Sequence, residues 1–299
     1  MIHGIINVYK EKGFTSHDVV AKLRGIVGQK KIGHTGTLDP DATGVLPVCL
    51  GKATKLCDLL TDKNKTYEAV LLLGKTTDTQ DITGEVLEEK STEALTEEKV
   101  REAIEGFIGD YEQIPPMYSA LKVNGKKLYE LAREGKVIER KARPVKILDI
   151  QILEIDLPKV RMEVSCSKGT YIRTLCHDIG EKLGCGGCME SLIRTRVSTF
   201  RIEDAKMLDE IETLKQEGKL AELLVPIDAM FPSYPKITVK DDWKAFAKNG
   251  NPLDLKMLKE ACGQEEETQV RLYDESGKFI AIYQWKEKKY HIVKMFFNE

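Results

Sequence analysis

Residues 33–47, with the sequence GHTGTLDPDATGVLP, are the most informative stretch of this chain. They combine three glycines, two prolines, three threonines and two aspartates. Glycine and proline at this density interrupt helices and strands, so the stretch is predicted to be a shaped loop. Pro40 also biases Asp39 toward an extended conformation, because its ring crowds the preceding residue. The sequence thus places the Asp39 carboxylate at a tight turn, although Asp-Pro-Asp also builds ordinary turns.

The overall composition is that of a soluble globular protein with one large domain, or with one domain and a small satellite. The chain has 299 residues, of which 31% are charged and 41% hydrophobic, and this length supports a sizeable core. It contains no long uncharged apolar run, and its first residues do not resemble a signal peptide. Seven scattered cysteines favour a reducing compartment. We therefore expect a cytoplasmic protein without a membrane partner.

Charge is distributed unevenly along the chain. The formal net charge of -2 argues against nonspecific polyanion binding by the whole surface. Residues 122–146, in contrast, carry nine basic side chains against three glutamates. Such a segment predicts an anion-binding face with salt-dependent affinity, and a solvated helix face with charge pairs is the alternative. The nine are Lys122, Lys126, Lys127, Arg133, Lys136, Arg140, Lys141, Arg143 and Lys146.

Hydrophobic periodicity predicts strands and helices in mixed order. Strands are expected at residues 2–8, 65–73 and 160–166, and over about 145–155 with one slip in alternation that suggests a bulge. Helices are expected from Thr15 or Ser16 to about Ile26, from Thr96 onward, and from Thr170 to Gly184. Because no regular βαβ repeat is present, we expect an α+β fold with a mixed or antiparallel central sheet flanked by helices.

A domain boundary is predicted where three prolines interrupt the chain between residues 226 and 235. Beyond it, short strands are expected at 236–239, 269–273, 279–285 and 290–297, with a turn at 274–277. This pattern predicts a small β-rich module. The expected division is therefore 1–230 for a catalytic domain and 231–299 for the module.

Five segments carry polar and aromatic residues in an order that is typical of one enzyme family. They are 33–47, 65–69 (KTYEA), 115–133, 168–175 (KGTYIRTL) and 192–197 (LIRTRV). Together they resemble the TruB family of tRNA pseudouridine synthases, of the bacterial stand-alone type. Carried over residue by residue, the resemblance implies that Asp39 is the catalytic carboxylate. It implies substrate contacts for His34, Tyr67, Tyr171, Arg173 and Leu192.

The resemblance also implies a fold, a substrate and partners. The fold would be that of pseudouridine synthases, with an RNA-gripping insertion at about residues 115–146 and a C-terminal PUA-like RNA-binding domain. The implied substrate is uridine 55 in the T-loop of tRNA, recognised through the shape of the T-arm and a base turned out of its stack. We expect a monomer that requires neither a guide RNA nor a protein partner. Residues 9–16 depart from the family pattern, which leaves the role of Lys10 open.

The chemistry of pseudouridine formation accounts for these residue types. The reaction breaks the bond between ribose C1′ and uracil N1 and rejoins the base through C5, so no cofactor or metal is expected. One carboxylate suffices, by covalent attack on sugar or base or by removal of a ribose proton. Arg173 would hold that carboxylate through its planar guanidinium. Tyr67 would stack on the uracil, Tyr171 would line the pocket, and His34 would fill the space left by the flipped nucleotide.

Other functions are alternatives at this point. An RNA-binding or RNA-folding factor with little turnover would keep its function without the Asp39 carboxylate. A guide-dependent relative inside a ribonucleoprotein is disfavoured by the complete insertion. A glycosidase that uses Asp39 and Asp41 is improbable, because their placement suits paired carboxylate chemistry poorly.

Two cysteines and their neighbours suggest a metal site at first sight. Cys185 and Cys188 have ligand-like spacing, and Cys176 and His177 lie shortly before them. Structural zinc sites need four well-spaced ligands, and Cys176 falls on the buried stripe of a predicted helix. A free, partly exposed thiol is therefore expected at Cys188 instead of a zinc ligand.

Overall fold

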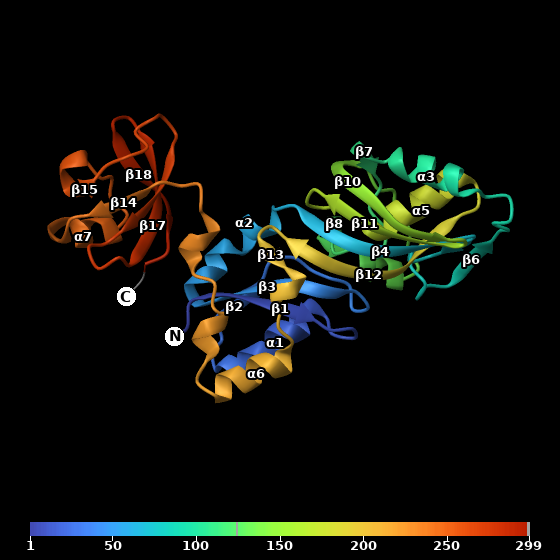
Figure 1. Cartoon of the computed structure of the whole chain (residues 1–299), viewed down its shortest axis with the longest axis horizontal. Coiled ribbons are helices and arrows are strands. Elements are labelled where there is room, and N and C mark those ends of the chain that lie inside the picture. The colour runs from blue at the N-terminus through green and yellow to red at the C-terminus, as the bar shows by residue number, and fades with distance from the viewer. Residues whose placement is uncertain (124, 298–299) are drawn as a thin grey trace.

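The computed structural model describes residues 1–123 and 125–297, and it places two large sheets in separate parts of the molecule (Figure 1). The first has nine strands in the order β1-β3-β12-β4-β11-β10-β7, with β2 beside β3 and β13 beside β12. All neighbours run antiparallel except β3 and β12. The mixed sheet expected from the sequence is thus confirmed. Its strands are β1 Gly4–Lys10, β2 Ile32–His34, β3 Thr43–Leu50, β4 Lys65–Leu73, β7 Gly109–Gln113, β10 Arg143–Asp156, β11 Lys159–Cys166, β12 Gly187–Val197 and β13 Phe200–Arg201.

Helices cover the nine-stranded sheet in two groups (Figure 1). At one end, α1 (Ser16–Val27) and α6 (Leu208–Gln216) bury a cluster with β1 and β3. At the other end, α3 (Glu97–Glu105) and α5 (Ile172–Leu183) pack over β4, β10 and β11. The shorter α2 (Cys57–Thr61) and α4 (Leu128–Arg133) lie outside these groups. Two small hairpins complete this part: β5 Lys75–Thr77 with β6 Val86–Glu89, and β8 Lys122–Val123 with β9 Lys126–Lys127.

Local signals in the sequence locate several of these elements well. Thr15 is the N-cap of α1 and forms a capping box with Asp18, which satisfies backbone amides at the helix start. Thr96 caps α3, and Gly184 ends α5 in the left-handed conformation, as expected for a residue without Cβ. The predicted strand 65–73 is confirmed as β4.

The prediction that all of residues 33–47 form a loop is wrong at both ends, because Ile32–His34 is strand β2 and Thr43–Leu50 is strand β3. Pro47 is tolerated there for a local reason. The Pro47 carbonyl accepts from the Thr35 amide at 3.2 Å, so the Pro47 nitrogen also faces away from β1. On that side of β3, β2 pairs only with residues 48–50 and β12 only with residues 43 and 44. The missing N–H therefore breaks no ladder hydrogen bond.

The long strand β10 is irregular at two places. Its register against β11 shifts between Ile147 and Asp149 and again between Ile152 and Glu154, where one bulge was expected. Arg143 and Lys146 lie on this strand. The last residues of the basic segment therefore lie in the central sheet.

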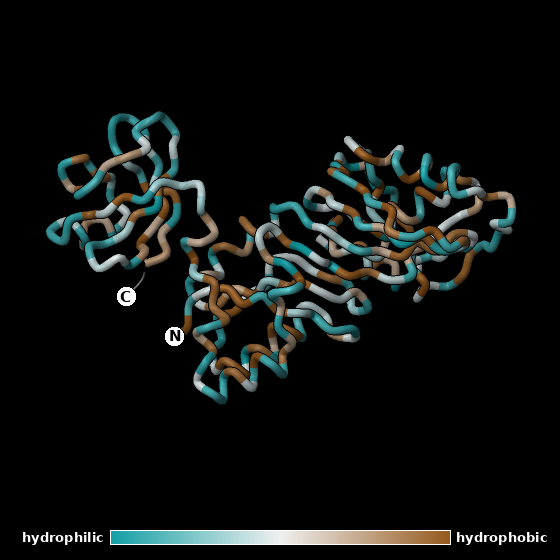
Figure 2. Tube along the Cα trace, viewed as in Figure 1, coloured by the Kyte–Doolittle hydropathy of each residue, from teal (hydrophilic) through white to brown (hydrophobic). Residues whose placement is uncertain are grey.

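The second sheet belongs to the C-terminal module and has the order β15-β14-β16-β17-β18. Helix α7 (Asp241–Lys248) packs beside it. The predicted strands are confirmed, β14 and β16 at the expected bounds. Figure 2 shows hydrophilic outer loops around this module. The strands are β14 Lys236–Val239, β15 Leu258–Glu260, β16 Gln269–Tyr273, β17 Phe279–Lys286 and β18 Lys289–Met295.

A hydrophobic cluster joins the C-terminal module to the nine-stranded sheet. Ile282 and Phe296 of the module share this cluster with Ile5, Cys49 and Leu56, and all five are buried. The junction is thus packed like a domain interior, which fixes the surfaces on its two sides relative to one another.

The cysteines are free thiols. Cys176, Cys185 and Cys188 are buried, so the expectation of a partly exposed thiol at Cys188 is wrong; the residue lies on β12, inside the sheet. Among the residues that the structure describes, no group of three or more His, Cys, Asp or Glu side chains is placed to hold a metal ion. Over the same residues, no helix has the length and apolar character needed to cross a bilayer.

Gly44 is expected to be essential for the parallel pairing of β3 with β12. It adopts a φ of +104°, and a Cβ there would lie 2.3 Å from the carbonyl oxygen of Arg194. Gly44→Ala should lower the free energy of unfolding by about 2–5 kcal/mol, from backbone strain plus overpacking. Urea denaturation measures the loss.

Gly28→Ala is the matched control. Gly28 also has a positive φ, of +73°, but nothing lies within 4 Å of its Cβ position. Strain alone should then cost roughly 1–2 kcal/mol. Equal losses in the two variants would contradict the role given to the Arg194 contact.

Candidate active site

Asp39 lies in the loop between β2 and β3, with its side chain 45% exposed. The Leu38 amide donates to Ser16 Oγ at 2.9 Å, and the Ala42 amide donates to the Asp39 carbonyl at 3.1 Å. These bonds close a tight turn around Asp39. The carboxylate Oδ2 lies 3.1 Å from Nε of Arg173. The structure therefore brings together the acid and the cation that the sequence analysis paired.

Arg173 is fixed in direction by acceptors around its guanidinium. It stands in the first turn of α5 with a side chain only 7% exposed. Nη1 donates to the Thr79 carbonyl at 3.1 Å, and Nη2 donates to the Tyr118 carbonyl at 2.9 Å. A guanidinium held on several sides presents its remaining N–H in one direction. Here that direction is toward Asp39.

A second carboxylate, Asp81, also contacts Arg173, with Oδ2 3.4 Å from Nη1. Its Oδ1 accepts from the Thr79 hydroxyl at 2.8 Å and from the Thr83 amide at 3.0 Å. Asp81 is therefore held in place by its own turn. It acts as a further counter-charge on the side of Arg173 away from the loop of Asp39.

Lys10, at the end of β1, hydrogen-bonds the backbone of the loop that carries Asp39. The residue is fully buried, and its Nζ donates to the Ala42 carbonyl at 2.6 Å and to the Pro40 carbonyl at 3.0 Å. Burial lowers the pKa of Lys10 to about 8. The ammonium thus adds a charge-assisted donor to the Ala42 carbonyl and to the Pro40 carbonyl, which also accepts from the Gly13 amide at 3.0 Å.

Arg194, on β12, holds the flanks of the same loop. It is 1% exposed, and Nε donates to the Val45 carbonyl at 2.7 Å, while Nη2 donates to the Gly36 carbonyl at 3.3 Å. Its guanidinium also hydrogen-bonds the hydroxyl of Tyr67. Burial lowers the pKa of Arg194 below the usual arginine value. Arg194 and Lys10 together determine the path of the backbone on both sides of Asp39.

Tyr67 and Leu192 form an apolar wall near the loop. Both are buried and share a hydrophobic cluster with Leu38 and Ala42. Tyr67 is on β4 and Leu192 on the neighbouring β12. Burial raises the pKa of Tyr67 to about 12, so its hydroxyl stays neutral at physiological pH.

Tyr171 connects the start of α5 to the end of β7. It is the N-cap residue of α5, and its amide donates to Gln113 Oε1 at 2.8 Å while its carbonyl accepts from Gln113 Nε2 at 2.9 Å. Burial raises the pKa of Tyr171 above its ordinary value. Tyr171 is half-buried and lies two residues before Arg173 in the sequence.

His34, at the end of β2, makes different contacts. Its Nδ1 accepts from the Gly36 amide at 3.3 Å, and its ring meets the edge of His17 with a centroid distance of 5.3 Å. Burial, followed by the charges of His17 and Arg194, lowers the pKa of His34. The ring is thus neutral, with Nε2–H as its free donor. Within the described ranges, no hydrogen bond or ring contact joins His34 to Asp39 or Arg173.

Comparisons with known proteins identify the family of this chain. Residues 24–172 match the model for the TruB family pseudouridylate synthase (N terminal domain), and residues 173–232 match that for the tRNA pseudouridylate synthase B C-terminal domain. The chain belongs to the TruB family of pseudouridylate synthases. Its members are enzymes of the isomerase class.

Among relatives, the tRNA pseudouridine synthase B of Lachnoclostridium phytofermentans is 58% identical over 99% of this chain and 100% of its own. That of Bacillus pumilus is 44% identical, over 98% and 96%. A solved H/ACA RNP bound to a substrate RNA containing 2′-deoxyuridine has 26% identity and a TM-score of 0.73, over 99% of this chain and 85% of that one. The TruB-type fold expected from the sequence is therefore confirmed.

The segment of this TruB-family chain where an insertion is expected, residues 115–146, has a small core of its own. Met117, Leu128 and Leu131 are buried together, and the Tyr118 carbonyl of the same segment accepts from Arg173. Exposed basic residues cover it, although Glu134 pairs with Lys126 and Lys136. This segment thus contacts Arg173 through a backbone carbonyl and presents cations to solvent, two of them paired with Glu134.

Sequence reasoning missed three residues that shape this TruB-family site. The sequence leaves the role of Lys10 open, the segment 192–197 implies a contact for Leu192 but not for Arg194, and none of the five motif segments includes Asp81. A signal for Asp81 was present: the sequence Thr79-Gln80-Asp81-Ile82-Thr83 has hydroxyl residues on both sides of an aspartate, which is typical of side-chain-closed turns.

Lys10→Met should reduce turnover by up to about 10²-fold, because a displaced loop misplaces the reacting carboxylate. Steady-state rates of the variant, compared with those of Lys12→Met at an exposed neighbouring position, test this expectation. A wild-type rate for Lys10→Met would contradict the supporting role.

The pH dependence of stability in the same variant tests whether the buried Lys10 ammonium has a lowered pKa. Burial lowers the pKa of Lys10 and of Lys65 to about 8, from 10.5. Above pH 8 the unfolded chain therefore holds more protons than the folded one, and stability rises with pH by at most about 1.4 kcal/mol per unit for each lysine. Urea denaturation from pH 7 to 9.5 should show a smaller rise for Lys10→Met than for wild type. Parallel curves would exclude a lowered pKa at Lys10.

Proposed function

We propose that this chain converts uridine 55 in the T-loop of tRNA to pseudouridine, with Asp39 as the essential carboxylate. The observation that carries the proposal is a half-exposed carboxylate held 3.1 Å from a buried arginine, at the edge of an apolar wall. Family membership and relatives named tRNA pseudouridine synthase B support the reaction and the class of RNA. The T-loop position is our inference from the resemblance of the motif segments.

The reaction requires little more than a directed carboxylate. The bond between C1′ and N1 breaks, the uracil turns, and a bond between C1′ and C5 forms, while C5 loses a proton and N1 gains one. Atoms and oxidation states balance without a cofactor. Asp39 acts on sugar or base as nucleophile, or on the ribose as base, and Arg173 directs it.

The aromatic and apolar residues would receive the uracil. Tyr67 would stack on the flipped base, a contact that contributes about 1–3 kcal/mol per base in nucleic-acid sites. Leu192 would close the same wall, and Tyr171 would line the side toward the insertion. The raised pKa of Tyr67, about 12, supports a role as a neutral ring instead of a proton acceptor at physiological pH.

His34 would enter the space that the nucleotide leaves. Extrusion costs a few kcal/mol, which inserted groups offset. The neutral imidazole keeps one N–H donor free, because Nδ1 already accepts from Gly36. That donor suits contact with base edges exposed by the extrusion.

We further propose that the chain works alone. Residues 1–230 would form the catalytic domain, with the insertion at about 115–146 gripping the RNA, and 231–299 a PUA-like RNA-binding domain. The Tyr118 carbonyl of this segment accepts from Arg173, which supports a site shaped by this chain without a guide RNA or protein partner. A monomer acting in the cytoplasm fits this arrangement and the free cysteines.

Asp39→Asn should abolish isomerisation, by roughly 10³-fold or more, while the dissociation constant for tRNA changes little. Incubation with an unmodified tRNA transcript, mapping of pseudouridine and tritium release from C5-labelled uridine measure this. Asp41→Asn is the matched control, since Asp41 is exposed in the same turn. Retained turnover in Asp39→Asn, or product at a position other than 55, would refute the respective part of the proposal.

His34→Ala should slow the reaction on folded tRNA more than on an unstructured oligonucleotide of the same loop sequence. The reason is that turning the nucleotide out of its stack costs free energy only in the folded tRNA, and His34 would offset that cost. Single-turnover rates on the two RNAs give the comparison. Equal slowing on both would remove this role from His34.

A further inference from the structure

Two imidazole rings meet at the edge of the loop that carries Asp39. His17 lies in the first turn of α1 and is exposed, and His34 ends β2 and is half-buried. The ring centroids are 5.3 Å apart, and the ring planes are nearly perpendicular, at 82°. Over the part of the chain that the structure describes, no hydrogen bond involves the His17 imidazole. The contact with the His34 ring is therefore the main interaction of this side chain.

The helix start that carries His17 is bonded to the loop of Asp39. The neighbouring Ser16 is buried, and its Oγ accepts from the Leu38 amide at 2.9 Å. Leu38 directly precedes Asp39 in the chain. The first turn of α1 and the loop therefore hold one another in place, and His17 extends this fixed arrangement to the ring of His34.

The His34 ring needs this second contact because its own hydrogen bond is weak. Nδ1 accepts from the Gly36 amide at 3.3 Å, which is long for a hydrogen bond from a backbone amide. A bond of that length leaves the ring plane free to tilt. Edge-to-face packing of two rings has its own preferred angle, so the Gly36 bond and the His17 contact together define the plane.

The neutral form of His34 belongs to the same arrangement. An imidazole accepts at Nδ1 only when it is neutral, because both nitrogens of the imidazolium carry a proton. Protonation would therefore set Nδ1–H against the Gly36 amide, donor against donor. Burial, followed by the charges of His17 on α1 and Arg194 on β12, lowers the pKa of His34. The carboxylate that interacts with His17 is Asp18, the next residue of α1.

We propose, resting on the insertion role proposed above for His34, that His17 is a positioning residue that fixes the ring plane and the neutral form of His34 for contact with RNA. A ring that keeps one plane and one tautomer offers its Nε2–H in one direction. Less ordering is then left to occur when the nucleotide turns out of its stack. The bond from Leu38 to Ser16 defines that direction relative to Asp39.

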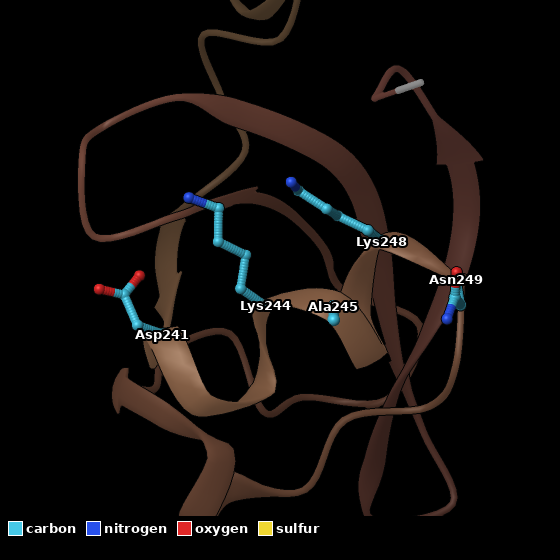
Figure 3. Close-up of a pocket in the computed structure, with 5 residues that line it drawn as sticks. All are labelled: Asp241, Lys244, Ala245, Lys248 and Asn249. Atoms are coloured by element: carbon cyan, nitrogen blue, oxygen red, sulfur yellow. The ribbon is translucent and has the colours of Figure 1, made fainter. Parts of the chain in front are cut away.

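Two substitutions separate the ring contact from the charge. His17→Phe keeps a ring that packs against His34 but takes no proton, and His17→Ala removes both. His291→Phe is the control, because it makes the same substitution on β18. His291 is the one histidine of residues 231–299, and the pocket on α7 of that module, which Figure 3 shows, is lined by none.

The titration of His34 is the direct readout. Histidine resonances in NMR, followed from about pH 5 to about pH 8, should show His34 titrating about 0.5 pH unit higher in His17→Phe than in wild type, because the like charge 5.3 Å away is gone. Since the neutral ring is the active form, the single-turnover rate on folded tRNA should fall at a correspondingly higher pH in this variant. The pH profile on an unstructured oligonucleotide of the same loop sequence should not move.

Rates at about pH 8, where an ordinary imidazole is neutral, report on the ring contact by itself. His17→Ala should slow the reaction on folded tRNA about threefold, the effect of losing one aromatic pair. His17→Phe should recover most of that loss, because its ring restores the packing against His34.

An unchanged titration of His34 in His17→Phe would overturn the proposal, as would a shift of the same size in His291→Phe. The proposal also fails if the pH profile moves equally on both RNAs, or if His17→Phe is as slow as His17→Ala at the higher pH. His34→Ala on the same two RNAs tests the role of His34 itself. Failure of the His17 contact is therefore distinguishable from failure of that role.

Discussion

The loop that carries Asp39 depends on cations buried beneath it. A turn rich in glycine and proline leaves carbonyl groups without ladder partners, and buried carbonyls need donors. Lys10 supplies them from β1 and Arg194 from β12. Arg173 approaches from a third side and contacts the carboxylate itself. The loop is therefore held by charge-assisted hydrogen bonds on a frame of strands, which is the rigidity that a directed reacting group requires.

Much of the fold was predictable because its signals are local. The capping residues Thr15 and Thr96, the left-handed Gly184 and the alternation in residues 65–73 each specify structure within a few positions, and tertiary packing did not override them. The pairing of Asp39 with Arg173 has no such local signal. It was implied by the resemblance to the TruB family, which relates segments that lie far apart in the sequence.

What the sequence could not predict are contacts between distant residues and the burial that results from them. Nothing in the sequence around Lys10 distinguishes it from a surface lysine. Its burial follows from the packing of β1 against the turn at residues 40–42. Pro47 looks like a strand breaker until the neighbouring strands leave its nitrogen unopposed. Cys188 was expected to be partly exposed, and the sheet covers it. In each case the residue type was known and its surroundings decided the outcome.

The two side chains that hold the loop come from opposite ends of the catalytic sequence, Lys10 from its first strand and Arg194 from one of its last. Contacts of such long sequence separation form late, because closing large loops of chain costs entropy before any contact repays it. During synthesis, Asp39 leaves the ribosome long before Arg194 is added to the chain. The Asp39 carboxylate therefore has no fixed direction until β12 has been synthesised. A chain that lacks this strand does not form the shaped site around Asp39.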